Sequence, residues 1–109
     1  MISAENFRMV YITTKDTIEA SNIARLLVEA KLAACCQVLA PSFSIYRWND
    51  KVQKESEVVL IVKTDESKLS AIESLVKKEH SYECPCIVTW NLNEGSEDYL
   101  TWLRDQIKE

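Results

Sequence analysis

The densest group of reactive side chains in this sequence lies in residues 80–86, which read His-Ser-Tyr-Glu-Cys-Pro-Cys. Imidazole and thiolate groups suit borderline and soft metal ions such as zinc and copper. Cys84 and Cys86 are two residues apart, so on an extended segment they point to the same side. One such pair with a single histidine, His80, falls short of the usual zinc-site spacing. The alternative interpretation is that the two cysteines pack as small apolar side chains and that His80 caps the preceding helix.

A second pair of thiols, Cys35 and Cys36, opens an expected strand, so the two side chains should point to opposite faces of a sheet. Simple packing is the expected role. A nucleophilic role would require a nearby cation to lower the pKa of the thiol. The sequence has no glycine-rich phosphate loop and no recognisable Ser-His-Asp set, so we expect no catalytic residues and no enzymatic activity.

Charged and aromatic side chains gather in the middle of the chain. Glu55 and Glu57 share one face of a long expected strand, and with Lys63 they can form ion pairs with another subunit or hold a cation. The competing interpretation is that these charges are solvated and contribute little. Aromatic residues commonly anchor cores and interfaces, and we expect that role for four of them: Tyr46, Trp48, Trp90 and Trp102.

These residues are positioned by an expected β-hairpin over residues 42–64. Its first arm alternates in polarity, and Asn49-Asp50 tolerates the left-handed backbone of a tight turn. The second arm, from Lys51 to Thr64, is far longer than an ordinary strand of roughly five or six residues. Residues 58–62 are apolar, whereas residues 53–57 are polar on both faces. The hairpin should therefore project beyond the domain, where another copy of the chain can cover its edge.

The remaining elements surround this hairpin. We expect a strand over residues 7–14, a helix capped by Asp16 and Glu19, and a strand over residues 33–39 that is the parallel neighbour of the first in a right-handed crossover. A second helix should run from caps at residues 65–67 to residues 79–80, and a strand over residues 86–92 should precede a C-terminal helix capped by Ser96. The C-terminal helix should bury a stripe of four residues: Tyr99, Trp102, Leu103 and Ile107. This order predicts an α+β fold of the ferredoxin-like, split βαβ type in a single domain of residues 1–109.

Composition narrows the possible partners. The 109 residues carry a net charge of -4 with scattered Lys and Arg, which disfavours nucleic acid and anionic membranes as partners. No apolar run approaches the roughly 20 residues of a membrane span, and no signal peptide is recognisable. Four cysteines are then expected as thiols in a cytoplasmic protein.

Five short blocks, in this order, resemble the CutA divalent-cation-tolerance family over almost the whole chain: Leu32-Ala33-Ala34-Cys35, Tyr46-x-Trp48, Glu55-x-Glu57 with Val62-Lys63-Thr64, His80-x-Tyr82-x-x-Pro85, and Tyr99-Leu100-x-Trp102. The resemblance implies a homotrimer similar in architecture to the PII signalling proteins, with hairpins pairing across subunits. It also implies association with copper and other divalent ions, no required cofactor and no established catalytic activity. The residues expected at the resulting cleft or interface are Tyr46, Trp48, Glu55, Glu57, Lys63, Tyr82 and Trp102.

The family's reactive block falls on His80, Tyr82, Glu83 and Pro85, and its Ala-Ala-Cys falls on Cys35. Two positions depart from the pattern, because serine replaces a proline at 81 and Cys86 replaces a glutamate. We therefore expect a metal site near His80 whose ligands are drawn from five residues: His80, Glu83, Cys35, Cys84 and Cys86. The two thiols of the loop would favour softer ions such as Cu(I).

Two other functions remain open from the sequence. A PII-like regulatory module would bind a small metabolite or anion between subunits, through Lys and Arg donors, and contact a partner protein. A thiol enzyme would need an exposed Cys35 beside a cation.

Overall fold

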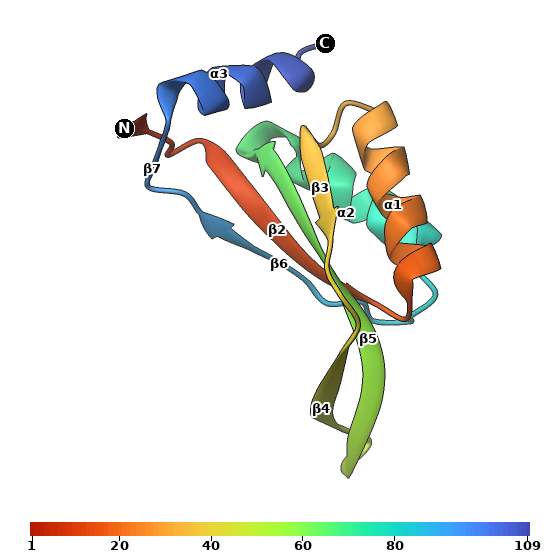
Figure 1. Ribbon diagram of the computed structural model, residues 1–109. Helices are drawn as coiled ribbons and strands as arrows, with labels where there is room; N and C mark the ends of the chain where they lie inside the picture. Colours follow the sequence, from red (N-terminus) through yellow and green to blue (C-terminus); the bar gives the residue numbers. More distant parts are fainter.

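The computed structural model describes residues 1–109 and consists of a twisted antiparallel sheet with helices on one face. The strands lie in the order β3 (Cys35–Val38), β5 (Lys51–Asp65), β2 (Phe7–Thr14) and β6 (Ile87–Asn91). Helices α1 (Thr17–Glu29) and α2 (Leu69–Glu79) cover one face, and α3 (Glu97–Gln106) lies across one end (Figure 1). The predicted α+β class and split βαβ order are confirmed.

The relation between β2 and β3 differs from the prediction. Both strands pair with β5 in antiparallel fashion, so they are parallel to each other but are not neighbours. Val62 of β5 lies opposite Val10 on one side and opposite Cys36 on the other. Strand β5 pairs on both edges, and this central position separates the two parallel strands.

The helix caps form as the sequence predicts. The Asp16 carboxylate accepts a 2.8 Å hydrogen bond from the backbone N–H of Glu19, and the Glu19 carboxylate accepts one of 3.0 Å from Lys15. Asp65 accepts from the N–H of Ser67 at 2.9 Å and begins a short 3-10 turn, Glu66–Lys68, before α2. Each cap satisfies a backbone donor that a helix start leaves without an internal partner.

Two hydrophobic clusters hold the molecule together. The larger one packs β2 and β5 against α1 and α2, with Ile12, Leu60 and Leu27 fully buried. The smaller one seats α3 on the end of the sheet through six side chains: Ala4, Phe7, Ala34, Leu100, Leu103 and Ile107.

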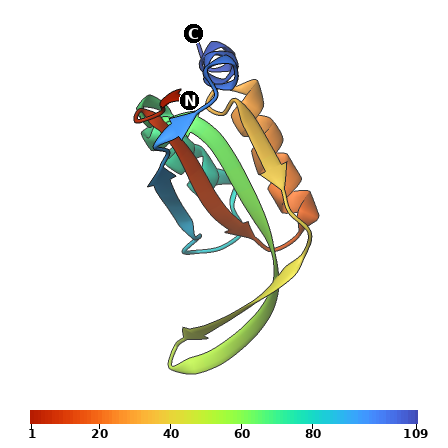
Figure 2. The same ribbon diagram turned by 60° about the vertical axis from the view of Figure 1, so that its left-hand side comes forward.

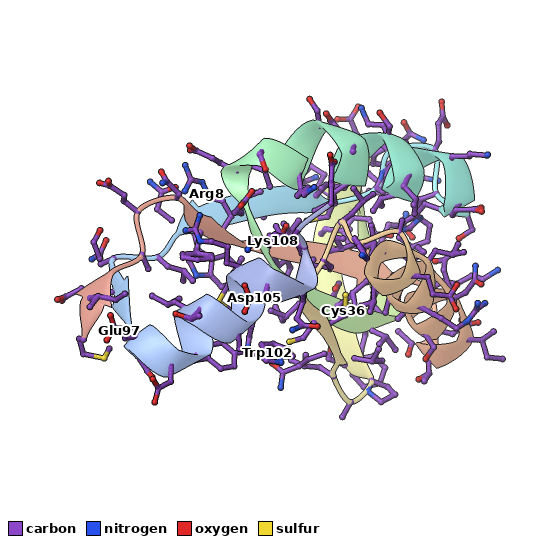
Figure 3. All side chains as sticks on the ribbon, turned by 90° about the horizontal axis from the view of Figure 1, so that it is seen from above. Arg8, Cys36, Glu97, Trp102, Asp105 and Lys108 are labelled. Carbon is purple, nitrogen blue, oxygen red and sulfur yellow. The ribbon has the colours of Figure 1, made fainter.

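The expected stripe of α3 is partly wrong. Tyr99 and Trp102 are 41% and 43% exposed, because Leu100 is the residue of that turn that faces the core. In the view over α3 (Figure 3), Trp102 lies on the side of the helix away from α2.

Two short elements were not predicted. Strand β1 (Ile2–Ser3) pairs with β7 (Glu94–Gly95) immediately before α3. The only glycine, Gly95, has no positive φ, but a Cβ there would lie 3.1 Å from the Leu100 side chain. Its small size therefore permits close packing of the smaller cluster.

The hairpin projects from the end of the sheet opposite α3 and both termini (Figures 1 and 2). Strand β4 (Ser42–Trp48) pairs with the first half of β5, from Ser42 opposite Glu57 to Trp48 opposite Lys51. Asn49 and Asp50 have φ of 50° and 63°, the left-handed values predicted for the turn. The arm makes the molecule elongated, at 45 × 25 × 23 Å.

Candidate functional site

A cavity of about 770 Å³ lies where the base of the hairpin meets the loop after α2. It is lined by side chains of β4 and β5, by the end of β2 and by the 82–86 loop: Thr13, Lys15, Ser44, Tyr46, Trp48, Glu55, Ser56, Glu57, Tyr82, Glu83, Cys84 and Cys86. The alternation of β4 places Ser44, Tyr46 and Trp48 on this side of the arm. The cavity therefore brings together eight of the twelve residues that the sequence singled out.

Glu57 and Tyr82 close the inner wall of this cavity. Glu57 is only 7% exposed, and its carboxylate accepts a 2.8 Å hydrogen bond from the Tyr82 hydroxyl. Burial raises the pKa of Tyr82, and the bond to Glu57 and the charges of nearby carboxylates raise it further, so Tyr82 stays a phenol donor. The arm was expected to project beyond the domain from residue 53 onward, but Glu57 does not project, because the 82–86 loop packs over the base of the arm.

His80 lies behind the cavity wall and does not line it. Its side chain is fully buried, its Nδ1 accepts a 3.0 Å hydrogen bond from the backbone N–H of Tyr82, and its Nε2 lies 2.8 Å from the carbonyl oxygen of Thr13. Since a carbonyl only accepts, Nε2 must carry the proton of a neutral ring. Both nitrogens are thus engaged within the chain, which leaves His80 no lone pair for a metal ion.

The alternative that the imidazole caps α2 is also incorrect. It is the backbone N–H of His80 that bonds to the last turn, at the carbonyl of Val76, while the ring reaches β2. The role of His80 is to tie the 80–86 loop to the sheet.

Glu19 extends this anchor from α1. Its carboxylate accepts hydrogen bonds from the backbone N–H groups of Lys15 and Ser81, and Oε1 lies 3.9 Å from Nδ1 of His80. Burial is the largest single influence on Glu19 and acts to raise its pKa, but the hydrogen bonds from Ser81 and Lys15 outweigh it. The net pKa of Glu19 is lowered. The sequence indicated Glu19 only as a cap, because its contact with Ser81 spans 62 positions.

Cys84 and Cys86 both line the cavity, and both are free thiols. Burial raises the pKa of Cys86, a bond with Thr13 opposes this, and the Glu57 charge adds to it. Pro85 between them does not line the cavity, as expected for alternation along an extended segment. Glu83 reaches the same space.

Cys35 lies elsewhere, on the sheet face near α3. Its Sγ is 3.9 Å from the Tyr99 hydroxyl, to which Lys63 Nζ donates at 3.1 Å. The bond to Tyr99 raises the pKa of Lys63, although burial opposes it. Trp102 packs beside Tyr99, with ring centroids 5.6 Å apart. Cys35 is half-buried rather than exposed, and Lys63 is the cation close to it.

Cys36 points to the opposite face, as predicted, and packs against the larger cluster (Figure 3). Burial raises its pKa to about 12, and the neighbouring Cys35 adds to the rise. At neutral pH this thiol is protonated and unreactive.

The expected metal ligands thus occupy three separate places. Glu83, Cys84 and Cys86 face the cavity, His80 is buried behind it, and Cys35 lies beneath α3. Nowhere in the chain do three or more His, Cys, Asp or Glu side chains converge in a way that could hold a metal ion. A single subunit therefore has an acidic cavity but no complete ligand set of three.

Comparison with known proteins identifies the family. The model of the CutA1 divalent ion tolerance protein family matches residues 8–106. The chain belongs to the CutA1 family. This confirms the resemblance read from the five sequence blocks, and the family is named for tolerance of divalent ions rather than for a reaction.

Individual CutA relatives agree with this assignment. A divalent-cation tolerance protein CutA from Thermus thermophilus is 39% identical, and the match covers 89% of this chain and 94% of the relative. A CutA homolog from Xenopus laevis is also 39% identical over 91% of this chain, but the match spans 66% of the relative's length. The chain spans 55% of a chloroplastic CutA from Arabidopsis thaliana.

Solved CutA structures share the fold. The structure from Thermus thermophilus has a TM-score of 0.91 at 37% identity, covering 94% of this chain and 99% of its own. The structure of CutA from Synechococcus elongatus has a TM-score of 0.93 at 30% identity, covering 98% and 95%. One from Archaeoglobus fulgidus, described as a periplasmic divalent cation tolerance protein, has a TM-score of 0.91. In the present chain, the helices are too short or too polar to cross a membrane.

Proposed function

We propose that this CutA1-family chain is a cytoplasmic homotrimer that contributes to metal tolerance by binding divalent ions, copper among them, in the cavity beneath the hairpin. The observation that carries the proposal is the charge of this cavity. It is lined by Glu55, Glu57 and Glu83 with a single lysine, Lys15. Carboxylates in a partly enclosed space attract and hold cations.

The hairpin supports self-association. Phe43, Ile45 and Val52, on the face of the arm away from the cavity, are 69%, 70% and 66% exposed. The outer edge of β4 has no strand partner within the chain. Exposed apolar strands are aggregation-prone unless they are covered, and closed symmetry lets identical copies cover one another. One chain does not supply three metal ligands to the cavity, and a neighbouring subunit would add further ones.

The cavity charge disfavours the two alternatives. A PII-like anion or metabolite site would need several Lys or Arg donors, whereas this space offers Lys15 against three carboxylates. A thiol enzyme built on Cys35 would need that thiol exposed, whereas Cys35 is half-buried next to the Tyr99 hydroxyl. Four free thiols with no disulfide favour a reducing compartment, the cytoplasm.

Native mass spectrometry of the full chain, with and without Cu(II) or Zn(II), tests this function because it reports subunit and metal stoichiometry together. We expect trimers that bind metal, and weaker divalent binding in the double variant Glu55→Gln/Glu83→Gln. The matched control is Glu73→Gln, since Glu73 is an exposed carboxylate on α2 paired with Lys77. A monomer at micromolar concentration, or divalent binding unchanged in the double variant, would contradict the proposal.

A further inference from the structure

The Cys84-Pro85-Cys86 segment supplies two thiols to one wall of the cavity. The residue before a proline is biased toward extended backbone, and alternate residues of an extended segment point to the same side. The lining agrees, because Cys84 and Cys86 face the cavity and Pro85 does not. Neither thiol is in a disulfide, and both are exposed.

The number of ligands on this wall of the cavity indicates which class of ion it can bind. Hard divalent ions need six or more oxygen ligands and zinc usually needs four donors, yet no three acidic, thiol or imidazole groups converge in the chain. A soft monovalent ion with a filled d shell can be held by two thiolates alone, and thiolates select such ions over hard ones. In number and softness the two thiols suit Cu(I) or Ag(I), whereas they are too few for a hard ion.

The surroundings of the pair favour a captured soft cation. Glu55 and Glu83 supply negative charge, and the aromatic side chains of Tyr46 and Trp48 line the same cavity from the arm. Glu57 is already engaged by the Tyr82 hydroxyl. The two thiols are thus the soft donors of a space whose charge draws cations in.

We propose that Cys84 and Cys86 bind one Cu(I) or Ag(I) ion per subunit as a two-coordinate bis-thiolate within the cavity. This assignment rests on the proposed metal-binding function and names the ion class of that site. Binding one M⁺ ion forms two metal–sulfur bonds and releases two thiol protons to solvent, with no change of oxidation state.

The test is an anaerobic titration of the full chain with Cu(I), in competition with the chelator bicinchoninate and followed by the ultraviolet thiolate-to-copper band. We expect one Cu(I) per chain. Cys84→Ser/Cys86→Ser should weaken binding by more than the roughly 100-fold that loss of an outer-shell contact costs. Cys35→Ser, which removes the half-buried thiol near Tyr99, is the matched control and should bind as the unaltered chain does. An unchanged affinity in the double variant, or an equal loss in Cys35→Ser, would overturn the assignment.

A second measurement needs no variant. Ag(I) added to the unaltered protein should protect Cys84 and Cys86, but not Cys35, from alkylation detected by peptide mass spectrometry. Equal labelling with and without Ag(I) would overturn the assignment. This result can be told apart from failure of the proposed function. If the protein forms trimers that bind Zn(II) but Ag(I) does not protect Cys84 and Cys86 from alkylation, the proposed function stands and only the soft-ion site is lost.

Discussion

The hydroxyl of Tyr82 donates a 2.8 Å hydrogen bond to Oε2 of Glu57, and this contact joins the loop after α2 to the base of the hairpin arm. The acceptor is a nearly buried carboxylate, and the donor lies 25 residues further along the chain. The loop and the arm are therefore positioned against each other, and the cavity between them has a defined inner wall.

Tyr82→Phe should destabilise the protein, because it leaves the Glu57 carboxylate buried without its donor. The expected loss is about 1–3 kcal/mol in the free energy of unfolding, measured by urea denaturation at one fixed protein concentration. Tyr11→Phe is the control, since the Tyr11 ring packs near Trp90 and its hydroxyl makes no hydrogen bond within the chain. Equal stabilities of the two variants would show that the Tyr82–Glu57 bond contributes nothing.

His80→Ala should lower stability without lowering metal stoichiometry. The change removes partners of the Thr13 carbonyl and the Tyr82 N–H, each worth about 1–3 kcal/mol when left buried and unpaired. Thermal unfolding measures the first effect, and native mass spectrometry at saturating Zn(II) measures the second. Loss of metal with stability preserved would restore His80 as a ligand.

Glu19 should contribute a distinct part of the acid sensitivity of the protein. Its pKa is lowered from the usual 4.5 in the folded chain, so its stabilisation is present above about pH 4.5 and is lost as the pH falls through the folded pKa. Glu19→Gln should be less stable by about 1 kcal/mol at neutral pH, because bonds to a charged acceptor are the stronger ones. The stability curves of variant and unaltered chain should converge in acid.

The control for this pH series is Glu29→Gln. Glu29 forms only an exposed pair with Arg25, with both side chains about 60% exposed, and a change of less than about 1 kcal/mol is expected. Parallel curves for Glu19→Gln and the unaltered chain across the whole acid range would contradict the role of Glu19.

Ile45→Asp should dissociate the proposed homotrimer. Ile45 is 70% exposed on the arm face away from the cavity, where a neighbouring copy is proposed to pack, and a buried unpaired carboxylate there is costly. Light scattering after size-exclusion chromatography measures the molar mass. Ile18→Asp, at an 81% exposed position in the first turn of α1, is the matched control and should leave the mass unchanged. Identical masses for both variants would remove Ile45 from the interface.

Local features of the fold were predictable from the sequence because short-range chemistry determines them. The Asn49-Asp50 turn, the Asp16 and Ser96 caps and the alternation of the arm all depend on residues within a few positions of one another. The insertion of β5 between β2 and β3 was not predictable in this way. Strand order depends on which edges pair across the chain, and a short strand–helix–strand sequence is compatible with either arrangement.

The candidate site shows the same limit. Residue type alone identified the reactive 80–86 segment and the acidic face of β5. Residues from both line the cavity, but His80 lies behind the cavity wall. The sequence did not predict that both His80 nitrogens are hydrogen-bonded. Their partners are a backbone carbonyl 67 residues away and a backbone N–H of the adjoining loop. Lys15 and Thr13 were missed for a similar reason, since nothing in their local sequence indicates contact with the 82–86 loop.

Strand β5 runs without interruption from the tip of the arm to the end of the sheet, and this continuity restricts how the protein can vary in length. Successive side chains of a strand face opposite ways. One residue inserted into each strand at the base of the arm would therefore move every side chain of the arm to the opposite face. Tyr46 and Trp48 would then turn outward, and Ile45 would turn into the cavity. Homologous hairpins should therefore differ at their base by even numbers of residues per strand.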